Sequence, residues 1–448
     1  MRVLGAGVGL AVGVGTTIGS GILRAPADVA AQLPDLTWII AVWVAGGIYA
    51  LLGAISMAEV ATLVARSGGF YPIARRGLGG YAGFVVGWLD FAAGCGSLAA
   101  LALLVGDNAD VVAPFIAPYT RVGAFVFGHG WSFPAGAAVV LVAFAALQWG
   151  GVVVGGRAQV AMSLLKGVAF LALVVACFFF AAGAHVDVKA APMPTGTSLA
   201  VAVAVALQGV IYTYDGWYSV IYLGEEVRDP GRDIPRSLFF TVAAVTIIQL
   251  LVVFAFLAVL PIGALAASKT PAADAAAVVV GGQADRVIAA IVVLSLAGAL
   301  NATLLGTPRV LYAMARDKVV PSRFSMTTAG GTPLPALGIV VVVAFLFLAS
   351  GTFERVAASL SVLMVGMYAS FFMAVFVLRR TEPETPRPFR AWGYPVTTAL
   401  GLALSLAFIV ATAVGDWKSA LMGGLILVLG VPAYFAQQAW QKRRGAER

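Results

Sequence analysis

Two short stretches hold the residues whose types could bind a small charged molecule within apolar sequence. Gly19-Ser20-Gly21 and Tyr214-Asp215-Gly216-Trp217 each interrupt a long apolar run with residues that form helices poorly. If these runs cross a membrane, an unwound turn frees backbone N–H and C=O groups that need partners. An amino acid zwitterion supplies both kinds, because its carboxylate accepts from N–H groups and its ammonium donates to carbonyls. Glycine and serine are also common where helices pack, so the first stretch alone is equally consistent with a helix contact.

Two ionisable residues also lie deep in apolar sequence. A carboxylate such as Asp215 is costly there and is a functional hypothesis by default: it could meet a cationic side chain, carry a proton or cap a half-helix. Its structural alternative is hydrogen bonding to the freed N–H groups of its own break. Lys166 could donate to backbone carbonyls and bridge helices. The residues alone slightly favour the alternative, in which Lys166 extends to the cytoplasmic interface near Arg157.

The elements that must position these residues are membrane helices. The chain has 448 residues, of which 61% are hydrophobic and 11% charged, against about 25% charged in soluble proteins. No separate soluble domain is visible, and Arg2 leads directly into apolar sequence, which predicts no cleaved signal peptide. No zinc-ligand spacing, Walker A motif or G-x-S-x-G motif occurs. We therefore expect neither an enzyme nor an ATP-driven pump, with no cofactor, no metal and no nucleic-acid partner.

Charged residues, prolines and glycines divide the apolar sequence into segments, which predicts about twelve membrane-spanning helices. Their limits are 3–31, 36–64, 81–112, 133–154, 158–184, 199–226, 237–263, 284–315, 335–351, 355–379, 393–414 and 417–440. Most Lys and Arg residues fall in alternate connections, and the positive-inside rule makes that side cytoplasmic, with both termini inside. Glu59, Glu225 and Glu226 lie at cytoplasmic span ends. We interpret them as solvated helix ends or, alternatively, as gate residues that pair with the basic loops.

The two irregular stretches lie in the first and sixth spans, five helices apart. This offset predicts a five-plus-five inverted repeat whose first helices are broken at the midplane, with repeat one at 3–184 and repeat two at 199–379. Helices eleven and twelve, at 393–440, would lie outside the repeat. The second break at the matching position favours a binding site over a packing contact for both stretches.

Five motifs in order resemble those of the amino acid–polyamine–organocation superfamily, and most closely its prokaryotic L-type amino acid transporters. The resemblance covers nearly the whole chain. The motifs are IGSGILRAPADVA (18–30), AEVATLVARSGGFYPIARRGLGGYAGFVVGW (58–88), YTYDGWYSVIYLGEEVRDPGRDIPRS (212–237), LNATLLGTPRVLYAMARDKVVP (300–321) and RPFRAWGYP (387–395).

The resemblance implies a LeuT-like, all-α membrane fold and alternating access, with substrate between helices one, three, six and eight. The substrate carboxylate would meet the Ser20 and Gly21 N–H groups, and the amine would meet nearby carbonyls. The residues so implicated are Thr17, Ile18, Gly19, Ser20, Gly21, Tyr212, Thr213, Tyr214, Asp215 and Trp217. Tyr212 matches an aromatic that gates the extracellular side. Lys166 matches a lysine that replaces a structural sodium ion, which overrides the interface alternative and argues against sodium coupling.

The chain departs from the family pattern at two places: the Ser56–Glu59 stretch lacks a frequent aromatic, and Ala65 replaces a frequent proline. Relatives also carry either Gly or Asp at the position of Asp215, which leaves the charge of the substrate's side chain open. No cysteine lies in 113–132, so we expect no disulfide-linked accessory subunit.

We predict a secondary amino acid transporter of the plasma membrane, either an exchanger or proton-coupled. The alternatives are a polyamine or cationic amino acid carrier, a non-transporting sensor with the same fold, and a channel.

Overall fold

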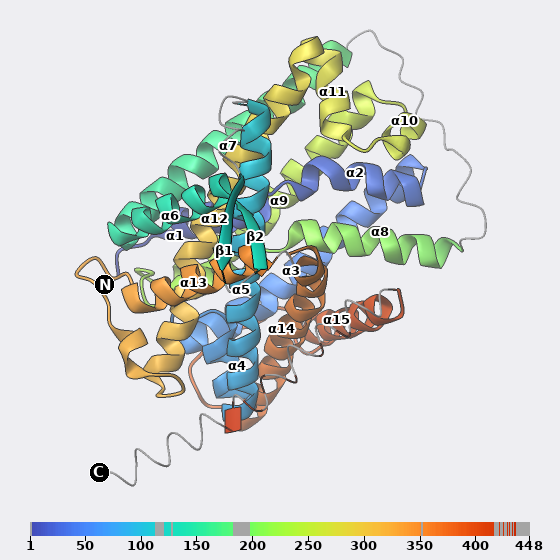
Figure 1. The fold of residues 1–448 in the computed structure, drawn as a ribbon. Coiled ribbons are helices and arrows are strands. Elements are labelled where there is room, and N and C mark those ends of the chain that lie inside the picture. Colours follow the sequence, from blue (N-terminus) through green and yellow to red (C-terminus); the bar gives the residue numbers. More distant parts are fainter. Residues whose placement is uncertain are drawn as a thin grey trace, which may run out of the picture.

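The computed structural model describes residues 2–112, 121–126, 129–181, 198–350 and 353–415, together with single residues between 421 and 435. Long helices dominate this part of the chain (Figure 1). In the first half they are α1 (Ala6–Thr17), α2 (Gly21–Gln32), α3 (Leu36–Val64), α4 (Phe70–Leu78), α5 (Gly80–Val112), α6 (Ala135–Trp149) and α7 (Val152–Ala181). In the second half they are α8 (Leu199–Tyr214), α9 (Pro230–Val259), α10 (Ile262–Ala267), α11 (Pro271–Val280), α12 (Ala284–Arg316), α13 (Leu334–Ser350), α14 (Phe353–Thr381) and α15 (Val396–Gly415).

Among the described residues, 7 helices are long and apolar enough to cross a membrane, or 8 if the bent pair α1–α2 forms one span. The shorter apolar helices Gly136–Trp149, Leu334–Ala349 and Val396–Ala411 coincide with further predicted spans. Large apolar side chains such as Phe179, Val168 and Leu164 on α7 are exposed, as expected of a surface that faces lipid. The prediction of a multi-pass, helical membrane protein is confirmed, while the predicted span 417–440 lies largely outside the described residues.

A β-hairpin departs from the purely helical prediction. Strand β1 (Arg121–Val126) pairs antiparallel with β2 (His129–Pro134), with Arg121 opposite Pro134 and Val126 opposite His129. Val, Phe and Trp in this stretch favour strands. The predicted fourth span, 133–154, therefore begins too early, because β2 ends at Pro134 and α6 starts at Ala135.

Two predicted boundaries shift for local reasons. The connection between α6 and α7 lies at Gly150–Gly151 instead of 155–157, because Gly151 has φ +96°, a conformation that glycine alone adopts readily. Helix α9 begins at Pro230, earlier than the predicted 237. The Asp229 carboxylate accepts from the Arg232 N–H there, and a proline in the first turn forfeits no helical hydrogen bond.

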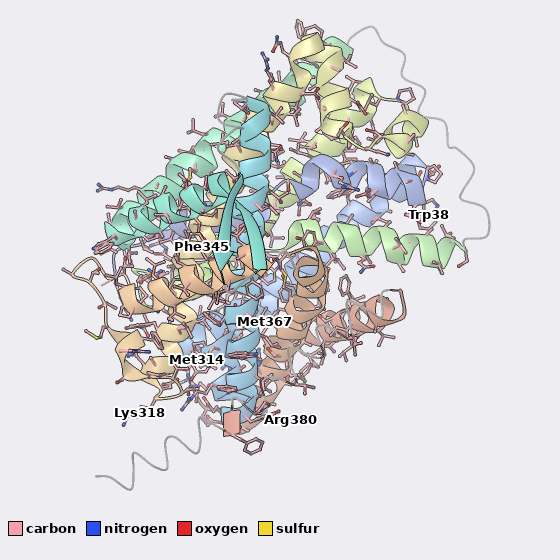
Figure 2. All side chains as sticks on the ribbon, viewed as in Figure 1. Trp38, Met314, Lys318, Phe345, Met367 and Arg380 are labelled. Carbon is pink, nitrogen blue, oxygen red and sulfur yellow. The ribbon has the colours of Figure 1, made fainter. Side chains whose placement is uncertain are left out.

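Packing brings distant segments together around the interrupted helices. Helix α12 runs along α5, and α1 packs against both α7 and α9 (Figure 1). Figure 2 shows Lys318 and Arg380, both predicted to be cytoplasmic, at the lower edge of the molecule, away from Trp38. Ion pairs at connections predicted to be cytoplasmic link Arg66 to Asp317 and Arg76 to Glu382.

Candidate substrate-binding site

The first interruption, break one (residues 18–20), separates α1 from α2, whose axes differ by 50°. Ile18 still donates to the Val14 carbonyl, and Gly19 donates to Thr17. Within the described part of the chain, the N–H groups of Ser20 and Gly21 have no acceptor. Break one therefore presents two free donors at the N-terminus of α2, where the helix dipole also favours an anion.

The carbonyls of break one are occupied by side chains from two other helices. Lys166 of α7 donates to the carbonyl oxygens of Gly15, at 2.9 Å, and Ile18, at 2.5 Å. Ser295 of α12 donates to the same Ile18 oxygen at 2.7 Å. Lys166 is only 1% exposed, so its ammonium lies inside the protein and does not reach the interface. These bonds tie α7 and α12 to the end of α1.

The second interruption, break six (residues 215–218), follows α8. Asp215 has an extended backbone, and Gly216 has φ +107°, which strongly favours glycine. The interrupted helices approach each other closely at these points. A Cβ on Gly216 of break six would lie 2.9 Å from the Thr16 Cγ2 atom at the end of α1, and one on Gly21, the first residue of α2, would lie 3.3 Å from the Thr213 Cγ2 atom of α8. Glycine at both positions allows the interrupted helices to approach this closely.

The Asp215 carboxylate is held by neutral donors. It accepts from the Tyr368 hydroxyl of α14 and, at 3.4 Å, from the Tyr218 hydroxyl. It also bonds to the backbone N–H of Gly216. The expected alternative, a hydrogen bond from an N–H group of its own break, is therefore present, and two tyrosine hydroxyls donate to Asp215 as well.

Two other predicted residues on α8 contribute differently. Tyr212 is 53% exposed, so its ring is accessible on the surface of α8. The Thr213 carbonyl accepts from Gln249 of α9 at 2.8 Å, and the Thr213 hydroxyl donates to Val210. In this conformation the Thr213 carbonyl already has a donor.

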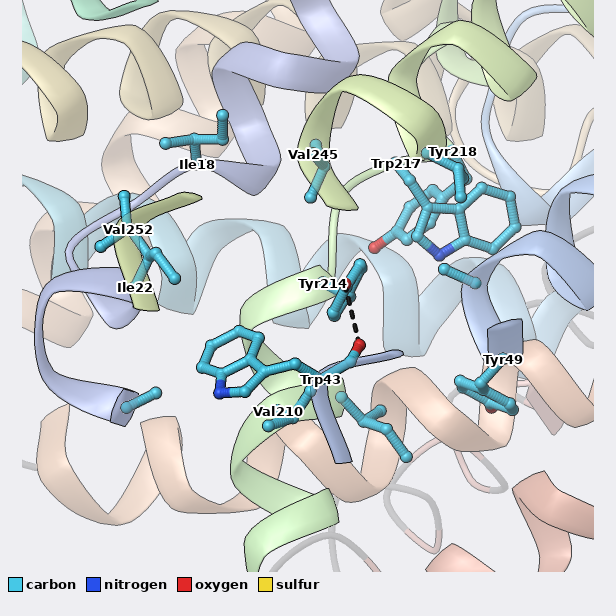
Figure 3. Packing of buried hydrophobic residues seen from close by; sticks show 14 of the residues in the cluster. Ile18, Ile22, Trp43, Tyr49, Val210, Tyr214, Trp217, Tyr218, Val245 and Val252 are labelled. Atoms are coloured by element: carbon cyan, nitrogen blue, oxygen red, sulfur yellow. Dashed lines mark hydrogen bonds between the residues drawn. The ribbon is translucent and has the colours of Figure 1, made fainter. Parts of the chain in front are cut away.

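Tyr214 and Trp217 lie in the apolar core (Figure 3). The Tyr214 hydroxyl donates to the Trp43 carbonyl of α3 at 3.1 Å. The Trp217 ring fills the space above Gly53, where a Cβ would lie 2.6 Å from it. These aromatics support break six from behind and do not line the cavity described next.

A cavity of about 80 Å³ opens beside break six, and it is large enough for several water molecules or a small polar group. Of the predicted site residues, it is lined by Asp215 alone. Its other walls come from the end of α1, from α5, α12 and α14, and from the residues after Asp215. They are Thr16, Asp90, Ala93, Gly94, Ser97, Tyr218, Ser219, Tyr222, Ala302, Thr303, Gly306, Thr307, Met364 and Met367.

Asp90 was missed in the sequence analysis. It is 4% exposed, and it accepts from the Tyr222 hydroxyl at 2.7 Å and from the Phe70 N–H at 3.4 Å. The signal that drew attention to Asp215, a carboxylate inside an apolar span, applies equally to Asp90. The wall residue from α1 is Thr16, one position before the predicted Thr17.

The acidic residues at the predicted cytoplasmic ends are paired, so the solvated interpretation is wrong for Glu59. Its carboxylate is 1% exposed, and it accepts from Arg379 and Arg387 and from the Ala391 N–H. Glu226 pairs with Arg309 of α12 at 2.9 Å. These pairs connect α3 to α14 and the segment after break six to α12.

An interrupted-helix site within a bundle of apolar helices defines a multi-pass membrane transporter. The sequence pattern of the family described as "Amino acid permease" matches residues 9–431. This chain belongs to that amino acid permease family, and its function is amino acid transport.

Its relatives are carriers rather than enzymes. The serine/threonine exchanger SteT of Bacillus subtilis is 25% identical over 95% of this chain and 94% of its own length. The human large neutral amino acids transporter small subunit 2 is 26% identical over 96% of this chain and 79% of its own. The human cystine/glutamate transporter is 25% identical over 97% of this chain and 85% of its own length.

Cys95 and Cys177 of this chain are free and buried.

Proposed function

We propose that this protein exchanges amino acids across the plasma membrane by alternating access, independently of sodium. The observation that carries the proposal is the close approach of break six to the end of α1 and of Gly21 to the end of α8, with free N–H donors at Ser20 and Gly21 and a buried lysine on the adjacent carbonyls. Exchange is preferred to proton coupling because SteT is an exchanger.

In the proposed complex the substrate carboxylate accepts from the Ser20 and Gly21 N–H groups. The ammonium donates to backbone carbonyls near Thr17, Tyr212 and Asp215. This arrangement gives each charged end of a zwitterion partners of opposite polarity. Tyr212, which is exposed on α8, would cover the site from the extracellular side.

Lys166 takes the part of a bound cation in this proposal. A sodium ion at this place would need oxygen ligands from break one and from neighbouring helices. The ammonium of Lys166 uses the carbonyls of Gly15 and Ile18 directly, and Ser295 adds a neutral donor. A protein-borne charge at this point removes the need for sodium.

The proposed topology has twelve spans and both termini in the cytoplasm. Repeat one covers 3–184, repeat two covers 199–379, and the last two helices occupy 393–440. The close approach of α1 to the segment after α8 fits two repeats that pair their broken first helices. No disulfide-linked accessory subunit is proposed, because the two cysteines are buried.

The test is exchange in proteoliposomes loaded with unlabelled amino acids and presented with a labelled panel. We expect uptake that requires internal amino acid and persists when choline replaces sodium. Uptake into empty vesicles at the same rate, or strict sodium dependence, would refute the proposed mode. Absence of uptake for every amino acid would refute the assignment of transport itself.

A further inference from the structure

Asp90 and Asp215 face the same cavity from different helices. Asp90 lies on α5, and Asp215 lies at break six. Neither carboxylate forms an ion pair within the described residues. Their partners are tyrosine hydroxyls and backbone N–H groups, which fill lone pairs but bring no positive charge.

The charge balance of this cavity is therefore incomplete. A carboxylate removed from water is costly unless a positive charge accompanies it. No lysine, arginine or histidine is among the residues that line the cavity. The buried Lys166 donates to the carbonyls of Gly15 and Ile18, and the buried Arg309 binds Glu226. These two buried cations are therefore already engaged by other partners.

Thr307 supplies an independent sign of a ligand. It lines the cavity from α12 and is 4% exposed, yet its hydroxyl has no hydrogen-bond partner within the described residues. Opposite it lies Gly94 of α5, which has no side chain to cover the hydroxyl. A buried hydroxyl is normally satisfied, and this one is open toward a space bordered by two carboxylates.

We propose that the cavity binds the positively charged end of the substrate's side chain, so that the favoured substrates are cationic amino acids. An ammonium has three donors and a guanidinium five, and neither has an acceptor. The Asp90 and Asp215 carboxylates can only accept hydrogen bonds, and the Thr307 hydroxyl can accept as well as donate. The cavity therefore suits either group. This inference rests on the proposed function, because the substrate backbone must first be held at the two breaks.

The first test compares near-isosteric ligands on the wild-type protein. In proteoliposomes that exchange labelled arginine, unlabelled arginine and citrulline compete, and lysine and norleucine form a second pair. We expect the neutral member of each pair to compete at least about tenfold less well, because it leaves buried carboxylates without a cation. Exchange of neutral amino acids with equal or better competition by citrulline and norleucine would overturn this inference and leave the proposed function standing. Absence of all exchange would overturn both.

The second test replaces one carboxylate. Asp90→Asn should raise the half-saturating concentration of arginine at least about tenfold, while neutral amino acids compete as well as before or better. Asp28→Asn is the matched control, since Asp28 forms only an exposed pair with Arg24, and it should change neither value. Equal losses for cationic and neutral substrates would show that Asp90 merely holds the Phe70 N–H at the start of α4, which contradicts the inference. If Asp90→Asn fails to fold, the ligand comparison on the wild type decides.

Discussion

Two polar regions at the centre of this protein solve the same problem in opposite ways. At break one, backbone carbonyls receive a positive charge from within the chain, through Lys166. In the cavity beside break six, the donors to two carboxylates among the described residues are all neutral. The carbonyls of the first region have a positively charged partner. The carboxylates of the second region have hydrogen-bond donors, but no positive charge among the described residues balances them.

This difference indicates which region carries its own cation and which would gain one from the substrate. Lys166 belongs to the chain, so the carbonyls of break one have a positive partner whether or not substrate is bound. Binding of a cation should stabilise the unbalanced pair of carboxylates more than it stabilises break one, because the electrostatic interaction energy is large in a low-dielectric interior. The contrast separates recognition of the common amino acid backbone from recognition of the side chain.

The largest effect should come from removing the cation at break one. Lys166→Ala deprives the Gly15 carbonyl of its donor and leaves Ile18 with Ser295 alone. Because hydrogen bonds to charged groups contribute about 1.5–3 kcal/mol, we expect exchange to fall by about 100-fold, with a smaller loss of thermal stability. Initial exchange rates and melting temperatures of purified protein measure the two effects.

Lys269→Ala is the control for that change, because Lys269 is exposed in the segment before α11. It should leave both measurements unchanged. Normal exchange by Lys166→Ala, with an unchanged pH profile, would show that break one does not need a resident cation. The contrast between the two regions would then disappear.

A smaller effect should follow from blocking the close approach of break six to the end of α1. Gly216→Ala adds a methyl group 2.9 Å from the Thr16 side chain and 3.0 Å from the Thr17 nitrogen, at a φ of +107°. Such strain costs about 1–3 kcal/mol, so we expect exchange to fall by about tenfold and the melting temperature to drop. Gly209→Ala on the preceding helix α8 has no neighbour within 4 Å and should behave as wild type. Equal behaviour of the two variants would show that break six need not approach the end of α1 this closely.

The long apolar helices could be predicted because hydropathy depends on composition along each segment. Gly19-Ser20-Gly21 and Asp215-Gly216 marked both interruptions, since weak helix formers stand out in apolar runs. The α6–α7 connection was placed too late because Gly150–Gly151 had no charged neighbour to mark it. The β-hairpin was missed because it lies almost wholly in the predicted connection between the third and fourth spans; only Phe133 and Pro134 had been assigned to a span.

Side-chain direction was the part that could not be predicted. Helices that are apolar all round give no sign of which face is inward, and one residue turns a helix by about 100°. The cavity is therefore lined by Thr16 and not Thr17, while Tyr214 and Trp217 pack against α3. Asp90 could have been found by treating every carboxylate inside an apolar span as a candidate functional residue. Its position beside Asp215 could not, because it depends on how α5 packs against the segment after α8.

The smallest predicted effect compares two buried threonines whose hydroxyls have no partner in the described structure. Thr307 faces the cavity, whereas Thr241 packs against Gly13 of α1. A neutral hydrogen bond contributes about 0.5–1.5 kcal/mol, so Thr307→Val should weaken binding of a cationic substrate by about three- to tenfold. Its melting temperature without substrate should not fall, because no bond within the protein is lost.

Thr241→Val serves as the matched control for Thr307→Val. It removes a buried hydroxyl that no partner or cavity satisfies, and such a change is neutral or stabilising. We expect unchanged exchange and an equal or higher melting temperature. If both variants bind substrate as the wild type does, the Thr307 hydroxyl is not a ligand, and the cavity must discriminate by its carboxylates alone. If only Thr307→Val loses affinity, the cavity contacts cargo while the surroundings of break one serve to hold the helices.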